Sequence, residues 1–413
     1  MRMKFNKSSQ LLLVSATSLL VAGLVTACST LTVDFVFVTS SKAAGTNNFG
    51  EIDVLEVNSE SGNMRHIPTS PFPSGGRDPV AEAVSSDQTN LYVVNEDDNS
   101  IVQFVIGNDG KVYPQNTVNT PGIFPMAVAV NGTNLFVVDT YQPLSTCSTA
   151  APCSGSVGVL PITVGSGSPP SDTLGSPVSN GDLAYWPLNL PSQPADVIVP
   201  TGINVLASGA DLYISAYDNS VTPKAGYIFG FAIGSGGVLT PLNGGVPFPA
   251  GIHPSGIASD SSSNYVYVTD FTSGNVLGYS VSSGLLTALS GSPFPAGNAP
   301  SAVVADSQYS YLYVSNSLDS TVVAYSINGG ALSMLGTYAT GTQPVAIGID
   351  PSTNHFLYTA NYLGNGVTGS VSGFELSPTA GTLIHSQSSP YTVDALPTAV
   401  AAIPHGSTKS SSK

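Results

Sequence analysis

The residue with the clearest potential for acid–base chemistry is Glu82, because it interrupts a repeated apolar position. Seven prolines are each followed two residues later by Ala or Gly, and the third residue is Val or Ile in six of the seven cases. In the remaining case it is Glu82. A buried carboxylate is costly unless it is hydrogen-bonded or paired, and burial raises its pKa toward the range of a general acid or base. The alternative is a glutamate bonded to the backbone or to Arg77, or one that reaches into a wet channel.

His253 and Arg77 complete the set of predicted catalytic residues. His253 directly precedes one of the seven prolines, where an imidazole would suit proton transfer. The alternative is a surface histidine, because loops are mostly exposed. Arg77 and Asp78 stand just upstream of Glu82. Arg77 could orient a carbonyl or carboxylate of a ligand, or it could pair with Asp78 or Glu82.

The seven prolines also define the elements that must position these residues. They are Pro79, Pro125, Pro200, Pro254, Pro300, Pro344 and Pro397. Each begins a short strand, and about a dozen residues after each of the first six comes a second strand such as Leu91–Asn95 or Val266–Asp270. A repeat of about forty residues with several short strands per repeat is typical of a propeller blade. The count predicts an all-β fold, a seven-bladed β-propeller.

The two ends of the chain are predicted to share one blade. No second strand follows Pro397, because the chain ends, but an unmatched strand of the same type lies at Val36–Ser40. We therefore expect residues 397–403 to form the innermost strand of the blade built from residues 33–72, which closes the ring without an exposed edge. The propeller would span residues 31–405, with an irregular insertion at 155–199 and a disordered tail at 406–413.

Residues before the leading prolines and at the ends of the second strands should surround one mouth of the axial channel. Four of them are predicted ligand-binding residues: Asp78, Asp139, Asp270 and Gln343. Asn and Asp at strand ends have a simpler explanation, because their side chains bond to nearby backbone in turns. Trp186, the only tryptophan, lies in the insertion and would mark a recognition surface if it were exposed. The alternative is that it packs against an irregular outer strand.

The N-terminus and the cysteines indicate export. Residues 1–28 combine basic residues, an apolar stretch and a cysteine, Cys28, in the manner of a bacterial lipoprotein signal. The sequence therefore predicts lipidation of Cys28 and a membrane-anchored protein of the cell envelope, with Ser29 compatible with the outer membrane. Cys147 and Cys153 are predicted to form a local disulfide, since no histidine lies near them to suggest a metal site.

Charge and composition exclude some functions. All 25 acidic residues follow Cys28, and seven of the ten basic residues do, so the mature chain carries a net charge of −18. Nucleic acid is excluded as a partner, because binding to phosphates needs clustered Lys and Arg. No nucleophile-elbow, phosphate-loop or paired-histidine metal motif is present. A Ca²⁺ site from Glu82, Asn95, Asp139 and Asp270 is conceivable, but their spacing does not require one. We expect a monomer.

The repeats resemble the lactonase-type seven-bladed propellers, the family of bacterial 6-phosphogluconolactonase and fungal carboxymuconate cyclase. The resemblance is carried by the Ser-Pro-Phe-Pro turns at Ser70 and Ser292, by Pro254–Ile257, and by Tyr265–Asp270 followed by Gly274–Tyr279. It implies hydrolysis of a lactone or a related ring isomerisation. A phosphorylated lactone would require Arg or Lys clamps that this chain hardly has. Two interpretations remain: an envelope enzyme acting on a neutral lactone-like ring, and a non-catalytic propeller that binds a glycan, a small ligand or a partner protein.

Overall fold

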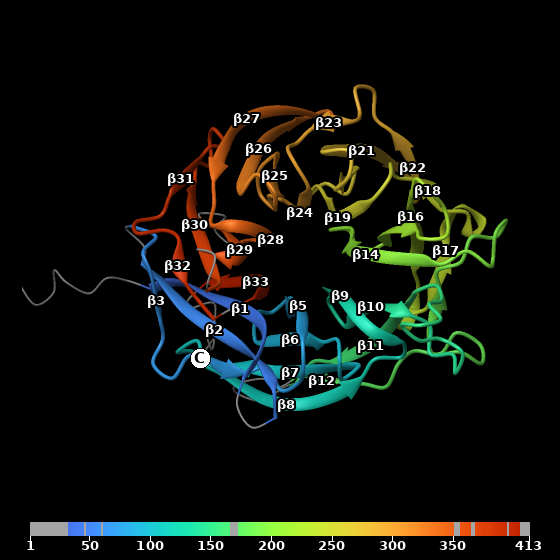
Figure 1. Ribbon diagram of the computed structural model, residues 1–413, viewed down its shortest axis with the longest axis horizontal. Helices are drawn as coiled ribbons and strands as arrows, with labels where there is room; N and C mark the ends of the chain where they lie inside the picture. The colour runs from blue at the N-terminus through green and yellow to red at the C-terminus, as the bar shows by residue number, and fades with distance from the viewer. Residues whose placement is uncertain are drawn as a thin grey trace, which may run out of the picture.

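The computed structural model describes residues 32–44, 47–58, 61–165, 172–350, 356–364, 368–394 and 396–404. The described strands form seven sheets arranged radially around a central axis, as Figure 1 shows. The prediction of a seven-bladed all-β propeller is confirmed. None of the described residues forms a helix that is long and apolar enough to cross a membrane.

The first four blades follow one another along the chain. Blade 1 contains β1 (Thr32–Ala44), β2 (Phe49–Asn58), β3 (Met64–His66), β4 (Phe72–Pro73) and the C-terminal β33 (Pro397–Pro404). Blade 2 contains β5 (Pro79–Val84), β6 (Asn90–Asn95), β7 (Ser100–Ile106) and β8 (Val112–Asn119). Blade 3 contains β9 (Ile123–Asn131), β10 (Asn134–Tyr141), β11 (Ser156–Thr163), β12 (Thr173–Leu174) and β13 (Trp186–Pro187). Blade 4 contains β14 (Ile198–Val205), β15 (Asp211–Asp218), β16 (Ala225–Ile233), β17 (Leu239–Pro241) and β18 (Phe248–Pro249), with two short 3₁₀ turns, η2 (Ser235–Gly237) and η3 (Leu242–Gly245).

The remaining three blades repeat this plan. Blade 5 contains β19 (Pro254–Ser259), β20 (Tyr265–Asp270), β21 (Asn275–Ser282), β22 (Leu285–Ala288) and β23 (Phe294–Pro295). Blade 6 contains β24 (Pro300–Ala305), β25 (Tyr311–Asn316), β26 (Thr321–Asn328) and β27 (Ala331–Ala339). Blade 7 contains β28 (Thr342–Ile349), β29 (Phe356–Gly364), β30 (Ser370–Leu376), β31 (Leu383–His385) and β32 (Tyr391–Thr392).

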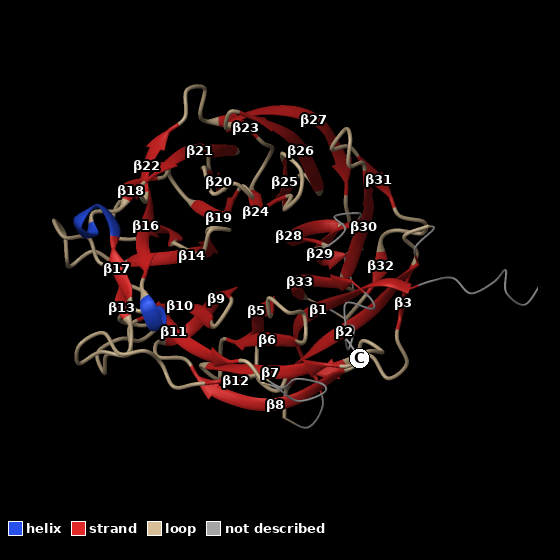
Figure 2. Ribbon diagram, turned by 180° about the vertical axis from the view of Figure 1, so that it is seen from behind, coloured by secondary structure: helices blue, strands red, loops and turns tan. Residues whose placement is uncertain are grey.

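Blade 1 closes the ring as predicted. The C-terminal β33 pairs antiparallel with β1, from Asp34 opposite Pro404 to Ser40 opposite Pro397. β33 is therefore the innermost strand of a sheet whose other strands come from the N-terminal part of the chain, as the blue and red strands side by side in Figure 1 show. Figure 2 shows the same closed ring from behind. The closure depends only on hydrogen bonds and packing, because no covalent link joins β33 to β1.

Small residues follow the leading prolines because the inner strands lie close together around the axis. A Cβ added to Gly256 would lie 3.3 Å from Cα of Ala302 on the next blade, and one added to Gly202 would lie 3.4 Å from a methyl group of Ile257. The first distance is tighter than ordinary van der Waals contact, and the second is at its lower limit. The Pro-x-Ala/Gly pattern in the sequence therefore reflects the crowding of the seven inner strands.

Neighbouring blades are also joined by hydroxyl groups. Ser255, Ser301 and Thr398, each one residue after a leading proline, donate hydrogen bonds to the carbonyl of the next blade's leading proline, at 2.5, 2.7 and 2.8 Å. Buried tyrosines at one position of the second strands make a further set: Tyr213, Tyr267 and Tyr313 donate to the carbonyls of Gly284, Gly330 and Gly381. Each bond satisfies a buried polar group and ties a blade to its successor.

Candidate functional site

The leading prolines lie together on one face of the propeller, named here the proline face. In each of the seven blades the leading proline pairs with a residue in the C-terminal half of the second strand, for example Pro254 with Asp270 and Pro125 with Asp139. The loops that enter the inner strands and leave the second strands therefore meet on this face, as the sequence predicts. Exposed apolar side chains also occur in these loops: Leu144, Phe271, Leu318 and Leu363 are 39–73% exposed.

Asp270 shapes the part of the proline face formed by blade 5. Its carboxylate accepts hydrogen bonds from the backbone N–H groups of Ile252 and His253 at 2.8 and 3.0 Å, and from the N–H groups of Thr272 and Ser273. The Ser273 hydroxyl donates to it as well. Although burial acts to raise the pKa of Asp270, these bonds stabilise the charged form and lower it below its usual value. Asp270 therefore fixes both the loop that carries His253 and the turn that carries Phe271.

His253 lies between two aromatic rings. The Tyr217 ring of blade 4 is 4.4 Å from the imidazole, centroid to centroid, and the Phe271 ring is 5.7 Å away, both in edge-on geometry. Lys224 places Nζ 3.9 Å from the centre of the Tyr217 ring. Partial burial and then the charge of Lys224 lower the pKa of His253, against the opposing effect of Asp270. A neutral imidazole with an aromatic flank and a nearby cation can act as a general base.

Sequence analysis identified His253 but missed Tyr217, Lys224 and Phe271. Phe271 directly follows Asp270 at the end of a second strand, so its place on the proline face could have been inferred. Tyr217 and Lys224 belong to the preceding blade, where β15 extends past the usual strand end and β16 begins at Ala225. Their approach to His253 depends on how blades 4 and 5 pack, which the repeat pattern does not encode.

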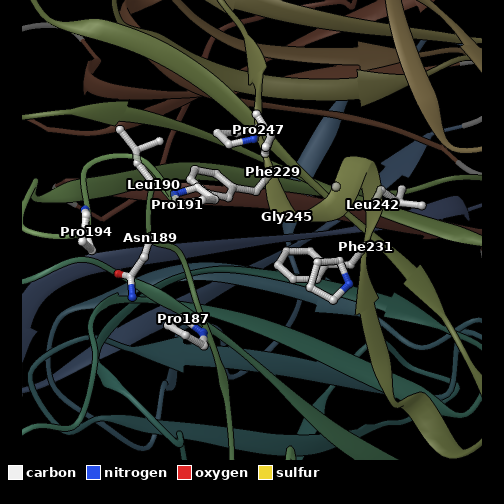
Figure 3. A pocket seen from close by; sticks show the side chains of 13 residues that line it. Pro187, Asn189, Leu190, Pro191, Pro194, Phe229, Phe231, Leu242, Gly245 and Pro247 are labelled. Atoms are coloured by element: carbon white, nitrogen blue, oxygen red, sulfur yellow. The ribbon is translucent and has the colours of Figure 1, made fainter.

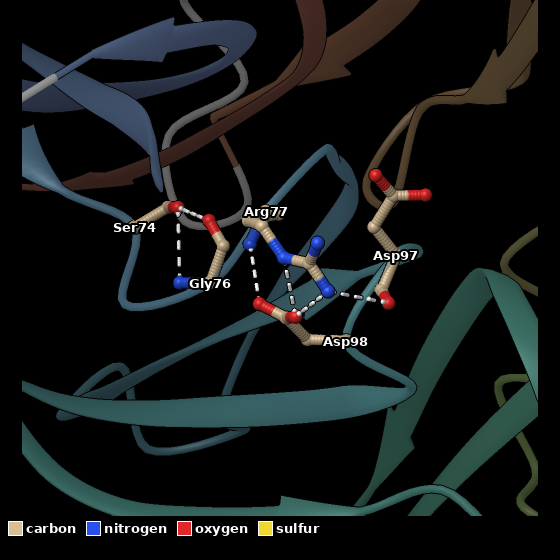
Figure 4. Close-up of polar contacts among 5 residues, drawn as sticks. All are labelled: Ser74, Gly76, Arg77, Asp97 and Asp98. Carbon is tan, nitrogen blue, oxygen red and sulfur yellow. Dashed lines mark hydrogen bonds and ion pairs between the residues drawn. The ribbon is translucent and has the colours of Figure 1, made fainter. Parts of the chain in front are cut away.

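Arg77 is bound by Asp97 and Asp98, as Figure 4 shows. Its backbone N–H and its Nε both donate to the carboxylate of Asp98 at 2.7 Å, and Nη2 donates to the carbonyl of Asp97 at 3.2 Å. The guanidinium is half exposed in this bidentate ion pair. The alternatives in which Arg77 pairs with Asp78 or Glu82 are therefore wrong. Asp78, the next residue, has a pKa raised by burial and then by the charge of Asp97.

Glu82 points from the inner strand of blade 2 toward blade 1. Its Oε2 accepts a hydrogen bond from the Thr39 hydroxyl of β1 at 2.5 Å, and its carboxylate accepts a second from the backbone N–H of Ala401 in β33. Oε1 is buried and has no hydrogen-bond partner among the described residues. Burial raises the pKa of Glu82 to about 7, although both hydrogen bonds act to lower it. Glu82 is thus a partly buried residue bonded to the Thr39 side chain, and it does not pair with Arg77.

The predicted catalytic residues do not converge. Glu82 lies at the joint of blades 1 and 2, Arg77 binds acidic residues of blade 2, and His253 lies at the joint of blades 4 and 5. The predicted calcium ligands are likewise distributed over blades 2, 3 and 5. Among the described residues, no group of three or more His, Cys, Asp or Glu side chains could hold a metal ion.

Asp139 and Gln343, two predicted ligand-binding residues, differ in their access to solvent. Asp139 is fully buried, with Oδ2 accepting a hydrogen bond from Gly122 N–H at 3.0 Å and Oδ1 unpartnered among the described residues. Burial raises its pKa to about 8. Gln343 is partly exposed and adopts a φ of 60°, and Asp78 and Phe124 before their own prolines also have positive φ. The shared backbone shape points to the repeat rather than to a ligand.

Trp186 is not on the surface, which corrects the expectation of an exposed aromatic residue. It is 3% exposed and packs in a core cluster with Val157 and Ile198. The reason is that the insertion folds back as β13, which pairs with the start of β11. Beside it, Phe229, Phe231 and the insertion line an apolar pocket of about 260 Å³ at the outer edge of blades 3 and 4, shown in Figure 3. Asn189 is its only lining residue with a polar side chain.

Comparisons with known proteins agree with this architecture. The family model described as a lactonase, a 7-bladed beta-propeller, matches residues 227–396, which include His253 and Phe271. This segment, about two fifths of the chain, is therefore similar to the lactonase seven-bladed β-propeller family. No curated protein matches the sequence.

Solved structures share the fold of this seven-bladed propeller at low sequence identity. A candidate 6-phosphogluconolactonase of Bacteroides fragilis is 19% identical with a TM-score of 0.66, covering 91% of this chain and 99% of its own. The periplasmic gluconolactonase of Pseudomonas aeruginosa is 18% identical with a TM-score of 0.65, covering 90% of this chain and 99% of its own. At such identities the similarity establishes the fold alone.

The propeller carries a disulfide on its proline face. Cys147 and Cys153 are bonded, as predicted, within the loop that joins β10 to β11. The same loop begins just after Tyr141, whose ring packs edge-on against Phe124 at 5.8 Å. The disulfide therefore restrains a loop beside a second aromatic pair. Disulfides of this kind are typical of proteins from oxidising compartments.

Proposed function

We propose that this lactonase-type propeller opens a neutral lactone ring at the proline face, with His253 as the general base. The observation that carries the proposal is the environment of His253. Its pKa is lowered, so the imidazole is neutral at pH 7, and its ring nitrogens make no hydrogen bond to the described residues. Tyr217 and Phe271 flank it with apolar surface against which a sugar-like ring can pack.

The reaction can be written for this set of residues. His253 removes a proton from water as the water oxygen adds to the lactone carbonyl carbon. Lys224, whose Nζ lies 3.9 Å from the centre of the Tyr217 ring beside His253, would supply the positive charge that stabilises the oxyanion. The bond between the carbonyl carbon and the ring oxygen then breaks, and the imidazolium returns its proton to the leaving alkoxide. The products are a hydroxy acid and the regenerated neutral histidine.

The charges favour a neutral substrate over a phosphorylated one. Arg65, Arg77 and Lys111 are each paired with a carboxylate. Of the two other basic residues in the described part of the chain, Lys42 lies on blade 1 and Lys224 lies beside His253. Binding of a phosphate group requires a bidentate Arg contact or several Lys contacts. The structural neighbour from Pseudomonas aeruginosa, named as a gluconolactonase, supports a non-phosphorylated sugar lactone as the substrate class.

Lactone hydrolysis by the purified protein tests this proposal. We expect acid release, followed in a pH-stat, from glucono-1,5-lactone and related neutral lactones, with kcat/KM for the 6-phosphorylated lactone at least about tenfold lower. Higher activity on the phosphorylated substrate would contradict the proposed specificity. If no lactone is turned over, the alternative of a non-catalytic propeller gains support, and calorimetric titration with neutral sugars and glycans at the same face is its test.

We further propose that the protein is exported and anchored to the envelope by a lipid on Cys28. Residues 1–28 lie outside the described residues, so the proposal rests on their sequence and on the disulfide. Metabolic labelling with a fatty acid should mark the wild-type protein in the membrane fraction, and Cys28→Ala should remove the label. A labelled Cys28→Ala protein, or an unlabelled wild type, would contradict lipidation at this position.

A further inference from the structure

We propose that blade 1 is held in the ring by two buried carboxyl groups, Glu82 on one side and Asp34 on the other, and that loss of their protons loosens the ring at this blade. Blade 1 is the only blade built from both ends of the chain. Its innermost strand, β33, is held in the sheet by β1 alone.

The first joint, between blades 1 and 2, differs from the other six. At the position of Glu82 the other inner strands carry Val128, Ile203, Ile257, Val303, Ile347 and Val400. Two of these aliphatic residues pack against apolar clusters that span two blades: Val128 against a cluster of blades 2 and 3, and Ile203 against a cluster of blades 3 and 4. Glu82 points the same way but makes polar contacts instead, to Thr39 of β1 and to the Ala401 N–H of β33. One side chain thus ties blade 2 to both strands that form the closure.

The second joint, between blades 7 and 1, also has a carboxyl group at a place where other joints do not. Tyr213, Tyr267 and Tyr313 donate their hydroxyl protons to a glycine carbonyl of the next blade. Tyr358, the equivalent residue of blade 7, instead donates to Oδ2 of Asp34 in β1 at 2.8 Å. Asp34 is 1% exposed, and its Oδ1 has no hydrogen-bond partner among the described residues. A titratable group has therefore replaced a backbone carbonyl at this joint.

Both carboxyl groups are poorly compensated when ionised. Glu82 has only the Thr39 hydroxyl and the Ala401 N–H as donors, and no charged side chain contributes to its pKa, which burial raises to about 7. Asp34 faces the Tyr358 hydroxyl and the carboxylate of Asp350, and Tyr391 lies beyond Tyr358. Burial and then Asp350 raise the pKa of Asp34 to about 7. Ionisation leaves a buried charge at each joint, which is unfavourable unless the joint opens to water.

Hydrogen exchange measured by mass spectrometry on the full-length protein tests the proposal. The readout is the protection of the β33 peptide relative to that of β24, an inner strand of blade 6, because the ratio cancels the intrinsic pH dependence of amide exchange. We expect this ratio in the wild type to fall about tenfold or more between about pH 5.5 and about pH 8.5. Glu82→Gln and Asp34→Asn should each reduce the fall, and the double variant should nearly abolish it.

Two further variants keep the test decisive. Glu82→Val gives this joint the residue type of the other six, so it should fold and should also remove the pH dependence contributed by Glu82. Asp139→Asn removes a buried carboxyl group of blade 3, away from the closure, and should leave the fall in the β33-to-β24 ratio unchanged. A ratio in the wild type that does not change with pH would overturn the proposal, as would an unaltered fall in the double variant.

Discussion

His253→Asn is expected to lower kcat/KM for a neutral sugar lactone by about 100-fold or more, because a positioned general base contributes roughly 10²–10⁴-fold. Asparagine keeps a polar group of similar size but cannot take a proton from water. The fold should survive, because the loop is held by the His253 backbone N–H, which donates to Asp270 in either variant. Initial rates in a pH-stat, with circular dichroism of both proteins, provide the measurement.

A pH profile distinguishes this role from a merely structural one. The rate should fall on the acid side as His253 becomes protonated. Lys224 lowers the pKa of His253, so Lys224→Met should raise that pKa and shift the acid limb to higher pH. His385→Asn is the matched control, because His385 packs against Phe374 in blade 7 and should leave both the rate and the profile unchanged. Equal losses in the His253 and His385 variants would rule out the assigned role.

Asp139→Asn and Asp270→Asn are expected to change stability in opposite directions at neutral pH, although both residues lie opposite the leading proline of their blade. Asp139 is buried with few donors, and its pKa is raised to about 8. Its protonated form is therefore favoured in the folded state, so its contribution is complete below the unfolded pKa and is lost as pH rises toward 8. Asparagine imitates the neutral acid, and Asp139→Asn should stabilise the protein by roughly 2–4 kcal/mol near pH 7.5 and by less near pH 5.

Asp270→Asn should change the stability in the opposite direction, because five hydrogen-bond donors surround the Asp270 carboxylate. Its pKa is lowered, so its contribution is present above the unfolded pKa and is lost as pH falls through the folded value. Because the NH₂ group of an asparagine would face N–H donors, Asp270→Asn should lower the free energy of unfolding by about 2 kcal/mol at pH 7. Urea unfolding between about pH 5 and pH 8 measures both variants. A stabilisation by Asp139→Asn that does not grow with pH would contradict the assignment.

The architecture of the propeller could be predicted from the repeat pattern in the sequence. The Pro-x-Ala/Gly spacing predicted seven inner strands, the missing partner of Pro397 predicted that β33 pairs with β1, and the cysteine spacing predicted the disulfide. The inner strands and the disulfide could be predicted because they are local: a proline at a strand start and a short loop between cysteines depend on neighbours in the sequence. The pairing of β33 with β1 joins opposite ends of the chain, and it could be predicted because the repeat left one strand at each end without a partner.

The candidate site was decided by contacts between blades. His253 was identified from its place before a proline, but its neighbours Tyr217 and Lys224 come from a different blade. Arg77 forms its ion pair with Asp98 and not with the adjacent Asp78. Trp186 became buried because the insertion that carries it pairs with β11. Asp139 and Asp270 occupy one repeat position with opposite pKa shifts, set by the number of donors around each. The sequence alone determined where strands begin and how many blades close the ring, because these depend on the period. Burial and charge state were decided only by the tertiary structure, because they depend on which side chains adjacent blades bring into contact.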